Sequence, residues 1–460
     1  MRLKLLLSIG LIGWMLSACS LDPKQDDPRL KTPAQFTPDA RFVELSGPSP
    51  KPSAWWEGYG DPQLNQLEQG LQGNQDLLAQ MQHIEQSRAY LAAQQGQLWP
   101  QADLAAGVSN QQLSRNRATY FPGFPYRYTD QSVALGLSWE PDVFGRLHDQ
   151  ERIAHSLLQA DEDDLHALQL SLQGQLALSY MALIADQQTR PLLQEQLADS
   201  RRYAQLMHLT LDAGNAVITT VDAADSAVET VQAELAQIDA DLALQEHALA
   251  LLLGHNAGSY QAPHGAQLPS VQRPQVLPAS VLARRPDVAR QLHLLEAAKA
   301  RIGLARSAYF PRFMLSAGAG LESGAPQELL DIPSQLWSLG ASSLVTLFDG
   351  GQRRALNRQM QAAYDEQVAH YRQSGLNAIR EAEDARSSLS AALAREDSLR
   401  RQVKLADEQA DQARIAEREG MSSELERLQA RIQARQLHIL LIQRQAESLS
   451  ADLHWLLAID

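Results

Sequence analysis

One pattern of apolar residues occurs twice in this chain, and it constrains the fold more than any other feature. In both copies the apolar residues follow one another at steps of three and four, a mean spacing of 3.5 that is typical of a coiled-coil seam. The positions are Val221, Ala224, Val228, Val231, Leu235, Ile238, Leu242, Leu249 and Leu252, then Leu425, Leu428, Ile432, Ile439, Ile442, Ala446, Leu449, Leu453 and Leu456. Each copy has one polar interruption, at Gln245 and at Arg435. The repetition predicts an internally duplicated protein of long helices, with Arg435 turned toward water or a carboxylate.

Composition excludes several classes of protein. Of 460 residues, 44% are hydrophobic and 20% are charged, which argues against a disordered chain and against a polytopic helical membrane protein. No apolar run reaches the roughly 18 residues that a membrane-spanning helix needs. The net charge of -14 makes nucleic acid an unexpected partner.

The N-terminus has the pattern of an export signal. Arg2 and Lys4 precede an apolar stretch, which ends in small residues before Cys19. We predict a signal peptide at 1–18. The pattern resembles the lipobox of bacterial lipoproteins, which implies acylation of Cys19, with palmitate as an acyl group, and sorting to the outer membrane. The alternative is an ordinary secretory signal with a chance cysteine. Cys19 is the only cysteine, so no disulfide forms within one chain.

A proline-rich segment follows the signal. Residues 19–60 are interpreted as a lipid anchor and extended tether, because proline lacks a backbone donor and fixes φ. Asp61 and Pro62 then start a helix that we expect to continue to about Leu98, with Trp55 and Trp56 packed against it.

Two segments alternate between apolar and polar residues with the period of a strand. The first is a hairpin at 101–140, whose long loop (110–131) contains five aromatic residues. The second is a hairpin at 311–348, with strands at 313–321 and 341–347 around a polar loop. Strands of about ten residues with one apolar face are typical of transmembrane β-hairpins. A hairpin of a soluble sandwich is the alternative.

Each hairpin leads into a very long helical stretch. The first ends near Asp212, and at 1.5 Å per residue it would be about 100 Å long. Pro191 predicts a kink near 187–190 rather than an end. The second ends at Glu419 and Gly420, and glycines suited to left-handed turns mark both ends. The expected organisation is therefore repeat 1 at 61–254, a linker at 255–285 and repeat 2 at 286–460.

Four strands per chain cannot close a barrel, and open sheet edges are unstable in hydrocarbon. The barrel must therefore be shared. Two chains would give eight strands and a filled interior, whereas three would give twelve and an aqueous path. A pore favours three chains, whose long helices would pack side by side into a tube.

Several short motifs carry a family resemblance. They are Trp55-Trp56 with Gly60-Asp61-Pro62, Leu282 to Asp287, Ala305 to Pro311, and Leu347-Phe-Asp-Gly-Gly351. Together they resemble outer-membrane efflux lipoproteins of the TolC-like family. The resemblance implies a mainly α fold with a transmembrane β-barrel: a homotrimer with a shared twelve-stranded barrel, a periplasmic α-barrel of coiled-coil helices and an equatorial belt. It also implies a periplasmic adaptor and an inner-membrane transporter as partners.

The resemblance further implies that the adaptor docks at the helix tips and opens a gate there. The tip positions are Asp212, Gly214, Asn215, Arg418, Gly420, Met421 and Ser422. Candidate gate residues are Asp411, Ile415, Glu417, Glu419, Glu426 and Gln429. Ile415 and Gln429 stand where family members often have acids. A solvated helix face is the alternative for Glu417, Glu419 and Glu426.

No motif for catalysis is present, and we expect no enzyme activity, no cofactor and no metal site. The predicted function is a passive exit channel of a tripartite efflux system in the outer membrane of a Gram-negative bacterium, carrying small molecules. The alternative is a periplasmic coiled-coil lipoprotein that acts as a spacer or adaptor without a pore. The acidic balance predicts a lumen that favours cations.

Overall fold

The computed structural model describes residues 43–44, 52–118, 120–123, 125–271, 275–276, 282 and 284–459. Cys19, the signal peptide and most of the predicted tether and linker lie outside these residues. The chain forms two compact units, and both cut across the two sequence repeats. The first unit includes His83–Glu162 and Arg290–Tyr371, and the second includes Asp163–Ala289 and Arg372–Asp460 together with the described residues before His83.

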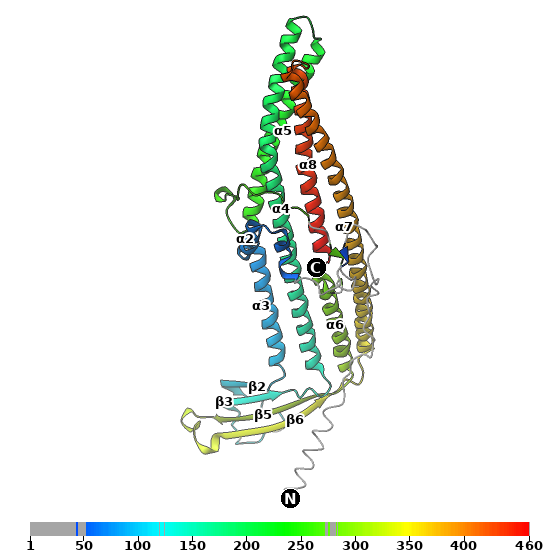
Figure 1. The fold of residues 1–460 in the computed structure, drawn as a ribbon. Coiled ribbons are helices and arrows are strands. Elements are labelled where there is room, and N and C mark those ends of the chain that lie inside the picture. The colour runs from blue at the N-terminus through cyan, green and yellow to red at the C-terminus, as the bar shows by residue number, and fades with distance from the viewer. Residues whose placement is uncertain are drawn as a thin grey trace. The chain divides into compact units, whose positions relative to one another are not determined.

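Helices dominate the element order (Figure 1). The helices are η1 (Pro52–Tyr59), α2 (Pro62–Gly70), η2 (Leu71–Gly73), α3 (Gln75–Gly96), α4 (Arg146–Asp212), α5 (Ile218–Leu252), α6 (Pro286–Ser307), α7 (Gln352–Arg418) and α8 (Glu424–Ile459). Short helical turns occur at η3 (Ala257–Ser259), η5 (Pro326–Glu328) and η6 (Ile332–Ser334). The strands are β1 (Val43–Glu44), β2 (Gln101–Gln112), β3 (Arg127–Trp139), β4 (Gln275–Val276), β5 (Arg312–Ser323) and β6 (Gln335–Leu344).

The first unit contains a four-stranded antiparallel sheet in the order β2-β3-β5-β6. The two predicted hairpins are thus confirmed, and β3 joins them through pairs such as Leu135 with Ala319. The bounds differ from the predicted ones. The last strand begins at Gln335 and ends at Leu344, whereas 341–347 was expected, because the apolar alternation already begins at Trp337 and Leu339.

The register gives this sheet two unlike faces. The apolar face carries Ala102, Leu104, Ala106, Val108, Val133, Leu135, Leu137, Trp139, Leu315, Ala317, Ala319, Leu321, Trp337, Leu339 and Ala341. The other face, called the polar face here, carries mostly polar or small residues, with Met314, Leu336 and Leu344 as its large apolar ones: Asp103, Ala105, Gly107, Ser109, Asp130, Ser132, Ala134, Gly136, Ser138, Ser316, Gly318, Gly320, Glu322, Ser338, Gly340 and Ser342. Large side chains on the apolar face stay exposed in a single chain, with Leu104 at 74% and Trp337 at 80%.

The two very long helices are confirmed as α4 and α7, each of 67 residues. α4 passes through Gly174 and Pro191 without ending, and α7 passes through Gly375. α5 and α8 return along them, and every position of the two apolar stripes is buried or half-buried. The heptad pattern therefore marks the helix faces that pack within the second unit.

One predicted helix is broken. The sequence indicated a single helix from Asp61 to about Leu98, but α2, η2 and α3 replace it. At the break, the side chain of Asn74 donates from Nδ2 to the carbonyl of Leu252 (2.9 Å) and accepts from the N–H groups of Asp76 and Leu77. A side chain added at Gly73 would meet the carbonyl of Leu253 at 2.9 Å. The helix is therefore interrupted here because the chain packs closely against the end of α5 and Asn74 caps the helix that follows.

The segment before α2 packs against the core of the second unit and is hydrogen-bonded to α8. Trp55 and Trp56 pack against a cluster that includes Leu64 and Leu176, as expected. The hydroxyl of Tyr59 donates to Asp452 in α8 (2.9 Å). Burial raises the pKa of Asp452 to about 6.

Candidate functional site

The two long helices end in the same backbone motif. Gly214 follows α4 with φ 75°, and Gly420 follows α7 with φ 72°. The next N–H in each case reaches back five residues, from Asn215 to the carbonyl of Thr210 (2.9 Å) and from Met421 to that of Ala416 (2.8 Å). This arrangement is the Schellman motif, which satisfies carbonyls that the helix end would leave open. The two tips thus turn the chain by the same geometry.

The helices that return from the tips begin differently. α5 begins after Val217, which makes no side-chain capping bond. α8 begins with a capping box, in which the Glu426 N–H donates to Ser423 Oγ (3.3 Å) and the Ser423 N–H donates to Glu426 Oε2 (3.2 Å). The Ser422 hydroxyl also donates to Glu426. In the described residues a capping box is present at the second tip and absent from the first, where His208 of α4 contacts Asp225 of α5 (3.1 Å).

These bonds hold Glu426 as a carboxylate. The hydrogen bond from Ser422 and that from the Ser423 backbone lower the pKa of Glu426. Glu426 was predicted from the sequence as a gate acid. In one chain its carboxylate caps α8.

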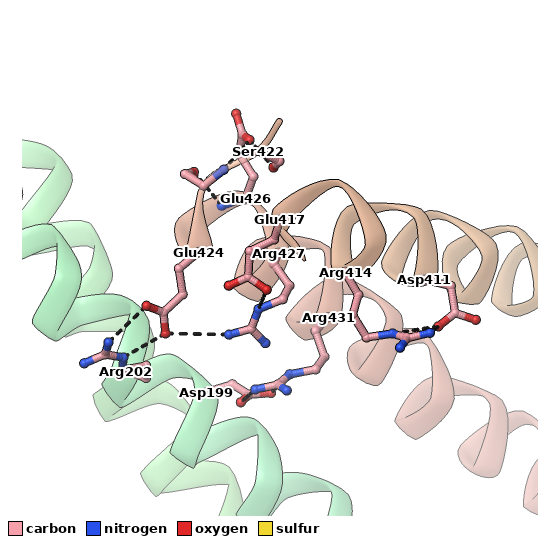
Figure 2. A network of polar contacts seen from close by, with 11 residues as sticks. Asp199, Arg202, Asp411, Arg414, Glu417, Ser422, Glu424, Glu426, Arg427 and Arg431 are labelled. Atoms are coloured by element: carbon pink, nitrogen blue, oxygen red, sulfur yellow. Dashed lines mark hydrogen bonds and ion pairs between the residues drawn. The ribbon is translucent and has the colours of Figure 1, made fainter. Parts of the chain in front are cut away.

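Charged contacts connect α4 with α8 below the second tip (Figure 2). The guanidinium of Arg202 donates twice to Glu424, at 3.0 Å from both Nε and Nη2. This paired geometry is the strong form of an arginine–carboxylate contact. The hydrogen bond from Arg202 also lowers the pKa of Glu424. The two helical hairpins of one chain are therefore joined at their ends.

Asp199 in α4 lies at the centre of these contacts and is shared by two arginines of α8. Arg431 donates to it from Nε (2.8 Å), and Arg435 forms an ion pair with it as well. Arg435 also donates to Glu195 (2.9 Å). The side chains of Asp199 and Arg435 are 9% and 13% exposed, so both charges are removed from most of the water. The prediction that Arg435 faces a carboxylate is confirmed.

The remaining candidate gate residues do not form one cluster. Glu417 forms an ion pair with Arg427 (2.8 Å), which also lies 3.6 Å from Glu424. Asp411 contacts Arg414 on its own helix (3.0 Å). Ile415, Glu419 and Gln429 are exposed. The structure of one chain thus connects Glu417 with the α4–α8 contacts and leaves the other three on the surface.

Sequence reasoning missed the α4 side of these contacts. α4 carries two acids and then an arginine at helical spacing, at Glu195, Asp199 and Arg202. α8 carries one acid and then two arginines at helical spacing, at Glu424, Arg431 and Arg435. Because the helices run antiparallel, the two series match pair by pair. A search for complementary charges at spacings of three, four and seven could have found them.

The tips also differ in what they expose. The first shows Val217 at 63% and Ile218 at 54% exposed, and the second shows Met421 at 71%. In the described ranges no group of three or more His, Cys, Asp or Glu residues is placed to bind a metal ion. No helix of these ranges is long and apolar enough to cross a membrane.

Comparisons with known proteins agree with this arrangement. The model of the family described as outer membrane efflux protein matches residues 67–255 and 277–454. The chain is 26% identical to the probable outer membrane lipoprotein SilC of Salmonella typhimurium, over 84% of this chain and 83% of that one. It is 29% identical to the toluene efflux pump outer membrane protein TtgC of Pseudomonas putida, over 90% and 86%.

Among solved structures, the outer-membrane channel OprN is similar, with a TM-score of 0.82 and 28% identity over 94% of this chain and 98% of that one. The family match covers most of the sequence and includes both repeats, the sheet and all four long coiled-coil helices. The chain belongs to the outer membrane efflux protein family and is an efflux channel protein of the outer membrane.

Proposed function

We propose that three copies of this chain close one twelve-stranded barrel and form the passive exit duct of a tripartite efflux system for small molecules. The observation that supports the proposal is the sheet with one apolar and one polar face. Within the described residues, the outer edges of β2 and β6 have no neighbouring strand, and such edges are not stable in hydrocarbon. Three copies supply twelve strands, with the apolar faces toward lipid and the polar faces around water.

Adjacent residues on opposite faces give the sharpest test. Val133 lies on the apolar face and Ser132 on the polar face of β3. Val133→Lys should cost about 2–4 kcal/mol in the membrane and abolish the heat-resistant trimer on gels. Ser132→Lys should assemble and alter conductance in planar bilayers. Equal behaviour of the two variants, or wild-type protein that never conducts, would favour the spacer or adaptor without a pore.

The proposed lumen should favour cations. Asp103, Asp130 and Glu322 lie on the polar face, where Arg312 is the one arginine or lysine among the paired residues. A wall of net negative charge concentrates cations. Reversal potentials in a salt gradient should show cation preference, and the triple variant D103N/D130N/E322Q should lose most of it. Anion preference in the wild type would contradict the assignment of this face to the lumen.

The tips are the proposed docking site for the adaptor. Asp212, Gly214, Asn215, Arg418, Gly420, Met421 and Ser422 surround the two turns, and the exposed apolar side chains there offer contact area. Photo-crosslinkers at positions 214 and 420 in cells should capture one periplasmic adaptor. Capture from position 251, an exposed leucine near the other end of α5, serves as the control.

The α4–α8 contacts and Glu417 are proposed to hold the tip end closed until the adaptor docks. Lipid attachment at Cys19 is proposed from the sequence. Mass spectrometry of the N-terminal peptide should show an acylated cysteine, and Cys19→Ala should give protein without acyl groups that retains conductance once reconstituted.

A further inference from the structure

The two hairpin loops of the sheet carry opposite charge. Loop A, residues 113–126 between β2 and β3, lies in a stretch from 104 to 129 that has arginines but no acidic residue. Loop B, residues 324–334 between β5 and β6, lies in a stretch from 313 to 348 that has acidic residues but no lysine or arginine. The arginines are Arg115, Arg117 and Arg127, and the acids are Glu322, Glu328 and Asp331. A positive segment is unusual in a chain with a net charge of -14.

Both loops lie at the same end of the sheet. β3 and β5 are antiparallel, and Gln131 near loop A is opposite Ser323 next to loop B. The chain enters β2 from α3 and leaves β3 into α4 at the opposite end. With the helices in the periplasm, as in the proposed function, the loops face the cell exterior and the outer leaflet of the membrane.

Arg127 stands at the boundary of the apolar face. Arg127, Thr129, Gln131 and Val133 follow one another at every second position of β3, so they lie on the same face, the one that we assign to lipid. Arg127 lies beyond the last apolar residue of that face. Its side chain is exposed and donates one Nη2 hydrogen to Gln112 Oε1 (3.0 Å). A guanidinium has five N–H donors, so most of its donors remain for another acceptor. The position corresponds to the headgroup level of a bilayer.

Arg115 in loop A is held by stacking. Its guanidinium carbon lies 3.9 Å from the centre of the Tyr126 ring, and the residue is exposed. The negative face of the ring attracts the guanidinium and favours this position of Arg115 before any ligand arrives. Phe121 in the same loop is 58% exposed, which is typical of aromatic residues that enter the interface of a membrane.

We propose that Arg115 and Arg127 bind the phosphate groups of lipid A, the diphosphorylated glycolipid of the outer leaflet. Arginine binds phosphate through paired N–H donors, and Arg115 and Arg127 are both exposed at the loop end of the sheet. Loop B, with Glu328 and Asp331, repels the same headgroups. The site rests on the proposed orientation of the sheet but adds a lipid ligand that a passive duct does not require.

Native mass spectrometry of the purified full-length protein tests this directly. Diphosphorylated lipid A should bind, and the dephosphorylated form should bind at least tenfold more weakly, since each charged hydrogen bond contributes about 1.5–3 kcal/mol. R115Q/R127Q should reduce binding of diphosphorylated lipid A by tenfold or more, and R115K/R127K should retain part of it. R312Q is the matched control, because Arg312 lies at the other end of the sheet and on the polar face.

Three outcomes would overturn the site. They are unchanged lipid A binding in R115Q/R127Q, equal loss in R312Q, and competition by inorganic phosphate at the concentrations at which lipid A binds. If the arginines instead pair with loop B of the same or a neighbouring copy, R115Q/R127Q would lower the heat stability of the assembled protein and leave lipid A binding intact. Conductance of R115Q/R127Q should equal that of the wild type, so a failure of the channel assay is separate from a failure of this site.

Discussion

The tip between α4 and α5 and the tip between α7 and α8 have the same backbone and different side chains around it. Gly214 and Gly420 hold nearly equal φ angles, and the same pair of backbone bonds closes each helix. The second tip adds a capping box and the charged contacts from α8 to α4. Duplication thus preserved the turn, whereas the helix that returns from the second tip also carries a side-chain cap and the charged contacts to α4.

The largest effect should follow removal of Asp199. Asp199→Ala leaves the mostly buried Arg435 with only an exposed carboxylate, which should cost about 3 kcal/mol of unfolding free energy and raise the conductance of the closed channel. Asp239→Ala is the control, since it breaks an exposed pair between α4 and α5 and should cost well under 1 kcal/mol. Similar leak currents in both variants would show that α4–α8 contacts have no special role.

The two turns should respond equally to loss of glycine. Gly214→Ala and Gly420→Ala each place a side chain at positive φ in open space, so only backbone strain of about 1–2 kcal/mol is expected. Thermal unfolding of both variants should show shifts within experimental error of each other. A clearly larger shift at either position would mean that one turn is held by contacts outside the single chain.

Changes to the capping residues should have opposite effects on the stability of the helices that follow the two tips. Ser423→Ala removes an existing cap and should destabilise α8 by about 1 kcal/mol, whereas Val217→Ser offers α5 a cap that it lacks and should stabilise it by up to about 1 kcal/mol. Hydrogen exchange at the start of each helix measures both effects. If Val217→Ser also accelerates exchange, the valine has a packing role that outweighs capping.

The smallest effect concerns pH. Glu424 and Glu426 have lowered pKa values, so their contacts stabilise the folded state above the ordinary carboxylate range and are lost as the pH falls through their lowered pKa values. A spin label at position 421 should keep its mobility down to the ordinary glutamate pKa of 4.5 and become more mobile only below it. A label at position 217 should change less. Equal changes at both positions would indicate general loosening.

Much of this architecture could be predicted because it repeats. The period of 3.5 located α5 and α8, and the period of two located both hairpins, since burial on one face leaves a regular trace in sequence. The break at Asn74 could not be predicted, because it depends on close contact with Leu253 across the fold. The extent of β6 was wrong because the apolar alternation that begins at Trp337 was left out of the predicted strand at 341–347.

The candidate site was predicted only in part. Glycines at the tips carry a local signal, as left-handed turns do. Glu426 was selected by its place in a family pattern, and its capping role follows from Ser423 three residues earlier, a signal that was present and not used. The contribution of Asp199 depends on the alignment of two helices more than 200 residues apart in the chain, which no local pattern specifies.

The opposite charges of loops A and B have a further consequence for the mouth of the duct. In the proposed trimer the positive and negative loops would alternate six times around the rim. The net charge of each chain's pair of loops is zero, counting Arg115 and Arg117 in loop A and Glu328 and Asp331 in loop B. The electric fields of the positive and negative loops cancel one another at distances from the rim greater than about one loop spacing. Salt weakens the remaining field further, over a screening length of roughly 8–10 Å. The loops themselves would therefore neither attract nor repel a departing molecule by their charge, and any selection by charge would come from the polar face of the barrel, where Asp103, Asp130 and Glu322 lie.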